Sequence, residues 1–159
     1  MSLPGIEKLR DEIGVTWEFG LYEIEKGALR RFVQAIDDQN PLWQDEECAS
    51  KSQYGGIIAP PMFILTMGFE QIQRKMATLM PGAGRLHGGT EVEYYQPVRP
   101  GDVITASGKI AQVQERESNK LGKIVLVTFN IKYTNQRQEL VTRCRQLTIL
   151  YQPEGIKYV

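Results

Sequence analysis

Apolar residues recur at two spacings along the chain, and these spacings separate a helix-rich first half from a strand-rich second half. In chain order the pattern predicts a helix over residues 5–13, a strand through Val15, Trp17 and Phe19, a helix over Glu25–Ile36 and a short helix over Asp45–Ser50. Gly14 and the turn-forming run Asp37–Pro41 separate these elements, because such residues favour turns over regular structure.

The most apolar segment begins at Pro60 and Pro61, and it predicts the longest helix of the chain. Proline suits a first helical turn, because the N–H groups there have no intrahelical acceptor. Residues 62–69 are almost wholly apolar, and Pro81-Gly82 ends the pattern. We therefore predict a helix of about 20 residues that starts near Pro60 and is buried at its beginning. The side chains expected against the sheet are Met62, Phe63, Leu65, Met67 and Phe69.

The chain after Gly88 carries the alternation and the β-branched and aromatic residues that are typical of strands. Strands are predicted over residues 89–96, 103–113, 123–134 and 139–151, with loops at 118–122 and 135–138. A sheet that wraps around a helix buries the apolar faces of both elements. We therefore predict an α+β fold in which an antiparallel sheet of about five or six strands curves around the long central helix.

Length and charge limit the classes of partner. At 159 residues the chain is the size of one compact domain, so we expect a single domain over residues 1–159. Lys plus Arg and Asp plus Glu both number 19, which favours neither nucleic acid nor an anionic membrane as a partner. No apolar run approaches the roughly 20 residues that span a bilayer.

The cysteines and the N-terminus favour a cytoplasmic location. Cys48 and Cys144 are far apart and form no CxxC pair, so we expect free thiols in a reducing compartment. Met1–Pro4 has neither the basic nor the apolar region of a signal peptide.

The first candidate motif is Asp38-Gln39-Asn40-Pro41-Leu42-Trp43. It resembles the Asp-x-Asn-Pro-Leu-His motif of MaoC-like hydratases and dehydratases, which have a hot-dog fold, and it differs at the final position. The resemblance implies that Asp and His hold a water and transfer its proton during addition across a thioester-conjugated double bond. Trp43 replaces the His, and indole cannot act as a base. The alternative is that Asp38 and Asn40 only cap a turn.

The second candidate motif covers residues 56–62, from Gly56 through Pro61 to Met62. In catalytic members of the resembled family, a glycine N–H at a helix start polarises the thioester carbonyl. Pro61 stands where that glycine is expected, and proline has no N–H. Two catalytic elements are therefore replaced in this sequence.

The third motif runs from Leu86 to Pro97 and includes His87. It is similar to the non-catalytic N-terminal half of two-hot-dog hydratases and to the acyl-binding subunit of two-subunit dehydratases. In those proteins one hot dog supplies the catalytic groups and the other widens the acyl groove. The resemblance covers about residues 15–150, and it implies substrate contacts from Asn40, Trp43, Tyr54, Gly56, Pro61 and Met62.

His87 is the only histidine, which makes it the one side chain whose ordinary pKa lies near neutral pH. Asp38 and His87 are therefore the candidate catalytic residues, although a lone histidine beside two glycines more often has a structural role. No carboxylate or histidine cluster indicates a metal, and we expect no cofactor. Residues 82–87 lack the third glycine of a dinucleotide motif and follow a helix, so we discard that interpretation.

Three functions remain open. The chain could be the acyl-binding subunit of an enoyl-thioester hydratase or 3-hydroxyacyl dehydratase, paired with a catalytic hot-dog chain. It could be a self-sufficient hydratase or thioesterase that uses Asp38 or His87 differently. It could also be a non-catalytic acyl-binding module. We expect an acyl-CoA or acyl-carrier-protein thioester as ligand and a homodimer when the chain is alone, because a single hot dog leaves an edge strand unpaired.

Overall fold

The computed structural model describes residues 4–153, and a single antiparallel sheet dominates it. Its strands are β1 Thr16–Glu23, β2 Gly84–Tyr94, β3 Val103–Ser118, β4 Gly122–Thr134 and β5 Leu140–Tyr151. Their order across the sheet is β1-β3-β4-β5-β2, so β1 and β2 form the edges. Met1–Leu3, on which the signal-peptide expectation mainly rests, lie outside the described residues.

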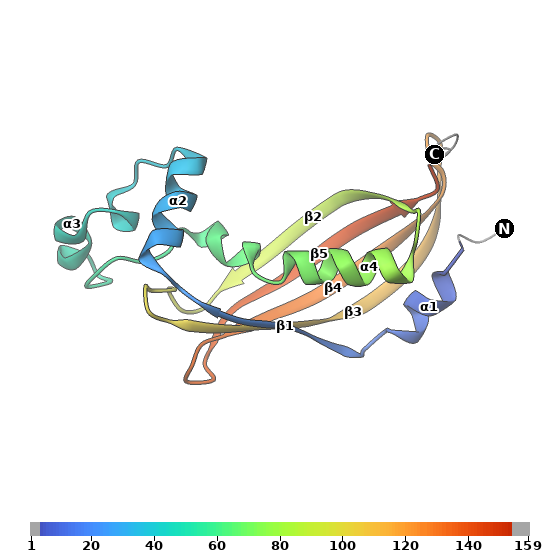
Figure 1. Cartoon of the computed structure of the whole chain (residues 1–159). Helices are drawn as coiled ribbons and strands as arrows, with labels where there is room; N and C mark the ends of the chain where they lie inside the picture. Colours follow the sequence, from blue (N-terminus) through green and yellow to red (C-terminus); the bar gives the residue numbers. More distant parts are fainter. Residues whose placement is uncertain (1–3, 154–159) are drawn as a thin grey trace.

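The helices lie on one face of the sheet and beyond one end of it. They are α1 Ile6–Asp11, α2 Lys26–Ile36, α3 Glu46–Lys51 and α4 Phe69–Leu79, with two 3-10 segments, η1 Pro41–Trp43 and η2 Pro61–Thr66. Figure 1 shows α4 along the hollow of the curved sheet, while α2 and α3 gather beyond one end of the strands. The α+β hot-dog prediction is therefore confirmed. Within residues 4–153, no helix has the length and apolar character needed to cross a membrane.

The core lies between the concave face of the sheet and α4. Successive side chains of a strand point to opposite faces, so alternate positions of β3 and β4 are directed toward the helix. The buried residues at these positions are Ile104, Ala106, Ile110, Val125, Val127, Phe129, Ile131 and Tyr133, and α4 adds Ile72, Met76 and Leu79. Full burial of each large apolar side chain contributes about 1.5–3 kcal/mol. The packing of α4 against the sheet is therefore the main source of stability.

The predicted long helix is divided in two, which corrects the sequence prediction. The 3-10 segment η2 ends at Thr66, and α4 begins at Phe69. Gly68 between them has a φ of 79°, in the left-handed region. A side chain at Gly68 would lie 2.9 Å from Phe19 of β1, so only glycine allows this close approach. The break is a tertiary effect, because β1 passes against the chain at this point.

The break also changes which side chains are buried. Phe63 and Met67 are buried and Leu65 is partly buried, as predicted. The prediction was wrong for Met62 and Phe69, which are 57% and 53% exposed. The prediction assumed one continuous helix with a single apolar face, and this assumption fails because the chain changes direction at Gly68.

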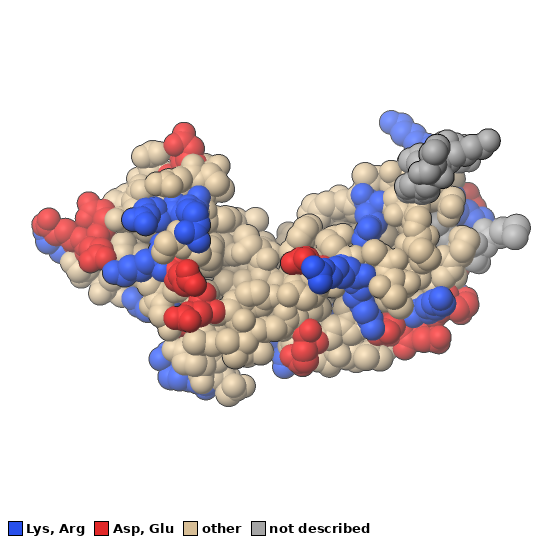
Figure 2. Space-filling model, in the orientation of Figure 1, with Lys and Arg blue, Asp and Glu red and all other residues tan. Residues whose placement is uncertain are grey.

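The face of the molecule that carries α4 has an uncharged area in its middle, where Figure 1 places η2. Figure 2 shows this area between charged side chains at the α2–α3 end and others over α4.

Strand β2 begins at Gly84, five residues before the predicted start at Gly89. A bulge between His87 and Gly89 lets the pairing with β5 continue through the glycine pair. A side chain on Gly88 would lie 2.8 Å from Leu147, which explains why glycine occupies the bulge. The bulge interrupts the alternation of side chains between the two faces of the sheet, so the sequence pattern did not reveal the first half of β2.

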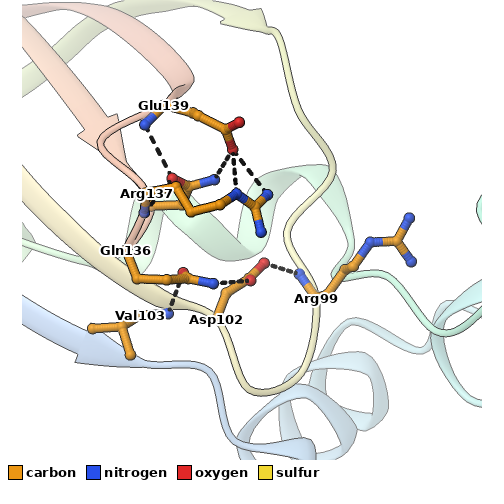
Figure 3. A network of polar contacts seen from close by, with 7 residues as sticks. Arg99, Asp102, Val103, Gln136, Arg137 and Glu139 are labelled. Atoms are coloured by element: carbon orange, nitrogen blue, oxygen red, sulfur yellow. Dashed lines mark hydrogen bonds and ion pairs between the residues drawn. The ribbon is translucent and has the colours of Figure 1, made fainter.

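A polar network fixes the loop between β2 and β3 against the β4–β5 turn (Figure 3). The Asp102 carboxylate accepts hydrogen bonds from the Arg99 backbone N–H at 2.8 Å and from the Gln136 side-chain amide at 3.1 Å. Gln136 in turn accepts one from the Val103 N–H at 3.1 Å. The adjacent Val98 carbonyl accepts the Ala59 N–H at 2.7 Å, so the loop is also tied to the segment before η2.

Gly68→Ala is expected to lower the free energy of unfolding more than Gly82→Ala. Both glycines have similar positive φ angles, 79° and 76°, so both alanines incur about 1–2 kcal/mol of backbone strain. Only the Gly68 substitution adds a collision with Phe19, because a methyl group at Gly82 would meet nothing within 4 Å. We expect an additional loss of about 1–3 kcal/mol, measured by urea unfolding. Equal losses for the two variants would contradict the role given to the Phe19 contact.

Candidate functional site

The turn after α2 is held by the side chain of Asp38. One carboxylate oxygen accepts the Asn40 backbone N–H at 2.9 Å, and the other accepts the Trp43 indole N–H at 2.9 Å. Asn40 repeats this pattern, since its side-chain oxygen accepts the Leu42 N–H at 3.0 Å. Both oxygens of Asp38 are thus engaged within the turn.

This geometry defines what the turn can do chemically. A general acid or base must be within hydrogen-bond reach of the proton that it transfers and must be able to exchange one. Indole donates a hydrogen bond, but its nitrogen accepts no proton and does not ionise near neutral pH, so it cannot act as a general acid or base. The Asp38–Trp43 contact therefore places a fixed donor next to the carboxylate, where the resembled family has an imidazole.

A cavity of about 270 Å³ opens beside this turn, at the start of η2. Its walls come from Tyr54, residues 58–61, Ile64, residues 94–98 and Thr142. These residues come from the segment before η2, from η2 itself, from the end of β2, from the β2–β3 connection and from β5. The Ile58 N–H donates to the Leu42 carbonyl at 3.3 Å, which joins the cavity wall to the Asp38 turn. Most lining side chains are aliphatic or aromatic, as expected for an acyl group.

Two of the predicted site residues, Tyr54 and Pro61, line the cavity, and the others lie outside its wall. Met62 follows Pro61, and its sulfur lies 4.0 Å from the Tyr94 hydroxyl, itself on the cavity wall. Gly56 lies in the loop between Tyr54 and Ile58, while Asp38, Asn40 and Trp43 form the adjoining turn.

His87 lies on β2 and is exposed, away from the Asp38 turn in the sequence and in the sheet. One imidazole nitrogen is 3.2 Å from the Thr90 hydroxyl, and the backbone of His87 pairs with Thr148. It is absent from the cavity wall.

Sequence reasoning gave no binding role to most of the cavity wall, namely residues 58–60, Ile64, residues 94–98 and Thr142. Residues 94–98 lay largely inside a recognised motif but were given no role in binding. Thr142 sits in a predicted strand, and alternation could have placed it on the concave face, although nothing in the pattern marks it as part of a cavity.

Two groups near the cavity keep their protons at neutral pH. Burial raises the pKa of the Cys144 thiol to about 11, so this cysteine is not a nucleophile under ordinary conditions. Burial also raises the pKa of the Tyr94 hydroxyl, with a smaller contribution from Cys144. Among residues 4–153, no group of three or more His, Cys, Asp or Glu side chains is arranged to hold a metal ion.

A second hollow, of about 560 Å³, crosses the opposite face of the sheet. Its walls carry charged side chains of both signs, including Lys109, Lys132, Arg143 and Glu93. This polar lining differs from the apolar lining beside η2 and is unsuited to an acyl chain.

Comparison with known proteins identifies the family. The sequence profile described as "FAS1-like, dehydratase domain region" matches residues 11–144. The chain belongs to this dehydratase family. One relative is a UPF0336 protein of Streptomyces avermitilis, 30% identical over 101 residues that cover 62% of this chain and 67% of the relative. Another is a 3-hydroxybutyryl-CoA dehydratase of Methylorubrum extorquens, 28% identical over 69% of this chain and 68% of the relative.

Solved structures of similar fold include members of this dehydratase type. A MaoC-like dehydratase from Rhodospirillum rubrum superimposes with a TM-score of 0.69 at 24% identity, covering 91% of this chain and 97% of the other. A chain of the HadBC (3R-hydroxyacyl-ACP dehydratase) complex from Mycobacterium tuberculosis gives a TM-score of 0.72 at 23% identity, covering 87% and 97%. These similarities establish the shared fold.

A double-mutant cycle on Asp38 and Trp43 is expected to reveal their hydrogen bond. Trp43→Phe removes the indole donor, and Asp38→Ala removes the carboxylate acceptor. We expect a coupling free energy of about 1.5 kcal/mol between the two changes, because the bond is partly buried and involves a carboxylate. Unfolding by urea measures each variant. Additive effects would show that the contact does not stabilise the turn.

Proposed function

We propose that this chain is the acyl-binding subunit of an enoyl-thioester hydratase or 3-hydroxyacyl-thioester dehydratase, and that a catalytic hot-dog chain is its partner. One observation carries the proposal. A mostly apolar cavity lies beside the Asp38 turn. Both carboxylate oxygens of Asp38 already accept hydrogen bonds within that turn, one of them from the indole of Trp43. The cavity can hold an acyl group, while the turn lacks a second proton-transfer group.

Addition of water to a conjugated thioester needs one group that takes a proton and another that delivers one. It is also helped by a backbone N–H that stabilises the enolate-like oxygen. At the start of η2 this chain has Pro60 and Pro61, neither of which has an N–H. His87 lies outside the cavity wall, so it does not replace the missing imidazole there. These features favour a division of labour in which this chain binds the acyl group and its partner supplies the acid–base pair.

Edge strand β2 is the proposed site of pairing. An unpaired strand edge is a ready acceptor for another strand, and β2 carries exposed Leu86 and Tyr94. Residues 94–98, at the end of β2 and just after it, line the cavity, so a partner on this edge would close the site. The fold similarity to a chain of a dehydratase complex supports this arrangement. The free thiols of Cys48 and Cys144 fit the cytoplasmic location, which stays a prediction.

The isolated chain is expected to be a weak hydratase. Loss of general acid–base help typically lowers a rate by roughly 100- to 10,000-fold, and we expect a deficit of this size against the complex with its catalytic partner. The measurement is the hydration of enoyl-CoAs of several chain lengths, with and without the partner. Rapid turnover by the isolated chain that Asp38→Asn abolishes would overturn the proposal, because Asp38 would then be a catalytic residue of this chain.

Restoring the family's catalytic residues one at a time tests whether Trp43 and Pro61 limit the hydratase activity of this chain. Trp43→His alone is expected to recover little activity, because Pro61 still offers no backbone donor, a contribution of about 3–4 kcal/mol in other enzymes. Trp43→His combined with Pro61→Gly should recover more than either change, as measured by kcat/KM for an enoyl-CoA. A full recovery from Trp43→His alone would show that the proline does not limit the site.

The isolated chain is expected to form a homodimer through β2. Sedimentation equilibrium should give twice the 18.1 kDa chain mass. Leu86→Lys places a charge on the proposed edge and should weaken the dimer at least about tenfold, since a buried charge would face the partner. Leu21→Lys is the matched control, because Leu21 is an exposed leucine on the opposite edge strand β1. A monomer in the wild type, or equal effects of both variants, would contradict pairing through β2.

A further inference from the structure

Thr142 is a polar residue in an otherwise apolar part of the core. It lies on β5, where its neighbours across the sheet are Tyr133 of β4 and Tyr94 of β2. It is 0% exposed, and it lines the cavity beside η2. Its side-chain oxygen is the one buried side-chain N or O within residues 4–153 that has no hydrogen-bond partner.

A buried hydroxyl without a partner is unfavourable, because it loses its hydrogen bonds to water and gains none in return. Valine has almost the same shape as threonine and would fill the position on β5 without this penalty. The presence of threonine at this position therefore indicates a hydrogen-bond partner that the chain itself does not provide.

The lining of the cavity indicates where such a partner would be. Tyr94 and Tyr95 are 47% and 45% exposed, so the cavity opens to solvent beside them, whereas Thr142 is fully buried in the cavity wall. The other walls include Ile58, Ile64 and further apolar groups. An acyl chain fits such walls, and an oxygen atom on that chain would fit the buried hydroxyl.

We propose that Thr142 binds an oxygen atom carried by the acyl group, and that it makes the cavity selective for oxygenated acyl thioesters over plain hydrocarbon ones. This inference rests on the proposed acyl-binding function and adds a specificity-determining residue to it. A hydroxyl both donates and accepts, so a hydroxyl or a carbonyl on the ligand can pair with it. A site built around such a hydrogen bond discriminates against a ligand that lacks the oxygen, because the buried hydroxyl is then left unpaired.

Isothermal titration with three six-carbon probes tests the proposal: hexanoyl-CoA, 3-hydroxyhexanoyl-CoA and 5-hydroxyhexanoyl-CoA. We expect the wild-type protein to bind at least one hydroxylated probe about tenfold more tightly than hexanoyl-CoA, a size typical of a single buried hydrogen bond. The probe that gains affinity identifies whether the oxygen lies near the thioester or far along the chain.

Thr142→Val removes the hydroxyl and keeps the shape. It should abolish the preference for the hydroxylated probe and leave the Tm equal or higher, because no internal hydrogen bond is lost. Thr142→Ser keeps the hydroxyl and should keep the preference. Thr148→Val is the matched control, since Thr148 is a buried threonine on the same strand outside the cavity wall, and it should change none of these affinities.

The outcomes separate this inference from the proposed function. If the wild type binds all three probes with equal affinity, or if Thr142→Val lowers all three affinities alike, the selectivity is disproved and acyl binding stands. If the wild type binds none of the probes, acyl binding by this chain fails, and the role of Thr142 fails with it.

Discussion

Packing of α4 against the concave face of the sheet is the constraint on which the rest of the molecule depends. The apolar side of α4, with Ile72, Met76 and Leu79, can be covered only if the strands curve around it. The curvature brings β1 close enough for Phe19 to meet Gly68, and this contact ends η2 before α4 begins. The cavity lies beside η2, so its position follows from the core.

The candidate site is built from short polar contacts that this core holds in place. Asp38 organises the turn after α2, and the loop around Val98 is fixed by Asp102 and Gln136. Between these two supports, the segment from Tyr54 to η2 forms one wall of the cavity. The cavity has mostly apolar walls and one buried hydroxyl, which suits the proposed binding of an acyl group.

The sequence predicted the fold class, the order of elements and most strands, because periodicity reports burial directly. It failed where contacts distant in sequence decide the local structure: the break at Gly68 depends on Phe19, and the early start of β2 depends on a bulge packed against Leu147. The family motif located the Asp38 turn and part of the cavity wall. Thr142 could not be predicted as a site residue, since a cavity formed by segments far apart in sequence leaves no local pattern.

The hydrogen bond between Asp38 and Trp43 gives the aspartate a structural role that does not depend on catalysis. An aspartate that supports a turn stabilises the fold whether or not it also transfers a proton. Its presence in a sequence is therefore not by itself a mark of activity. The residue five positions later is the more informative one, because an imidazole there can gain or lose a proton near neutral pH and an indole cannot.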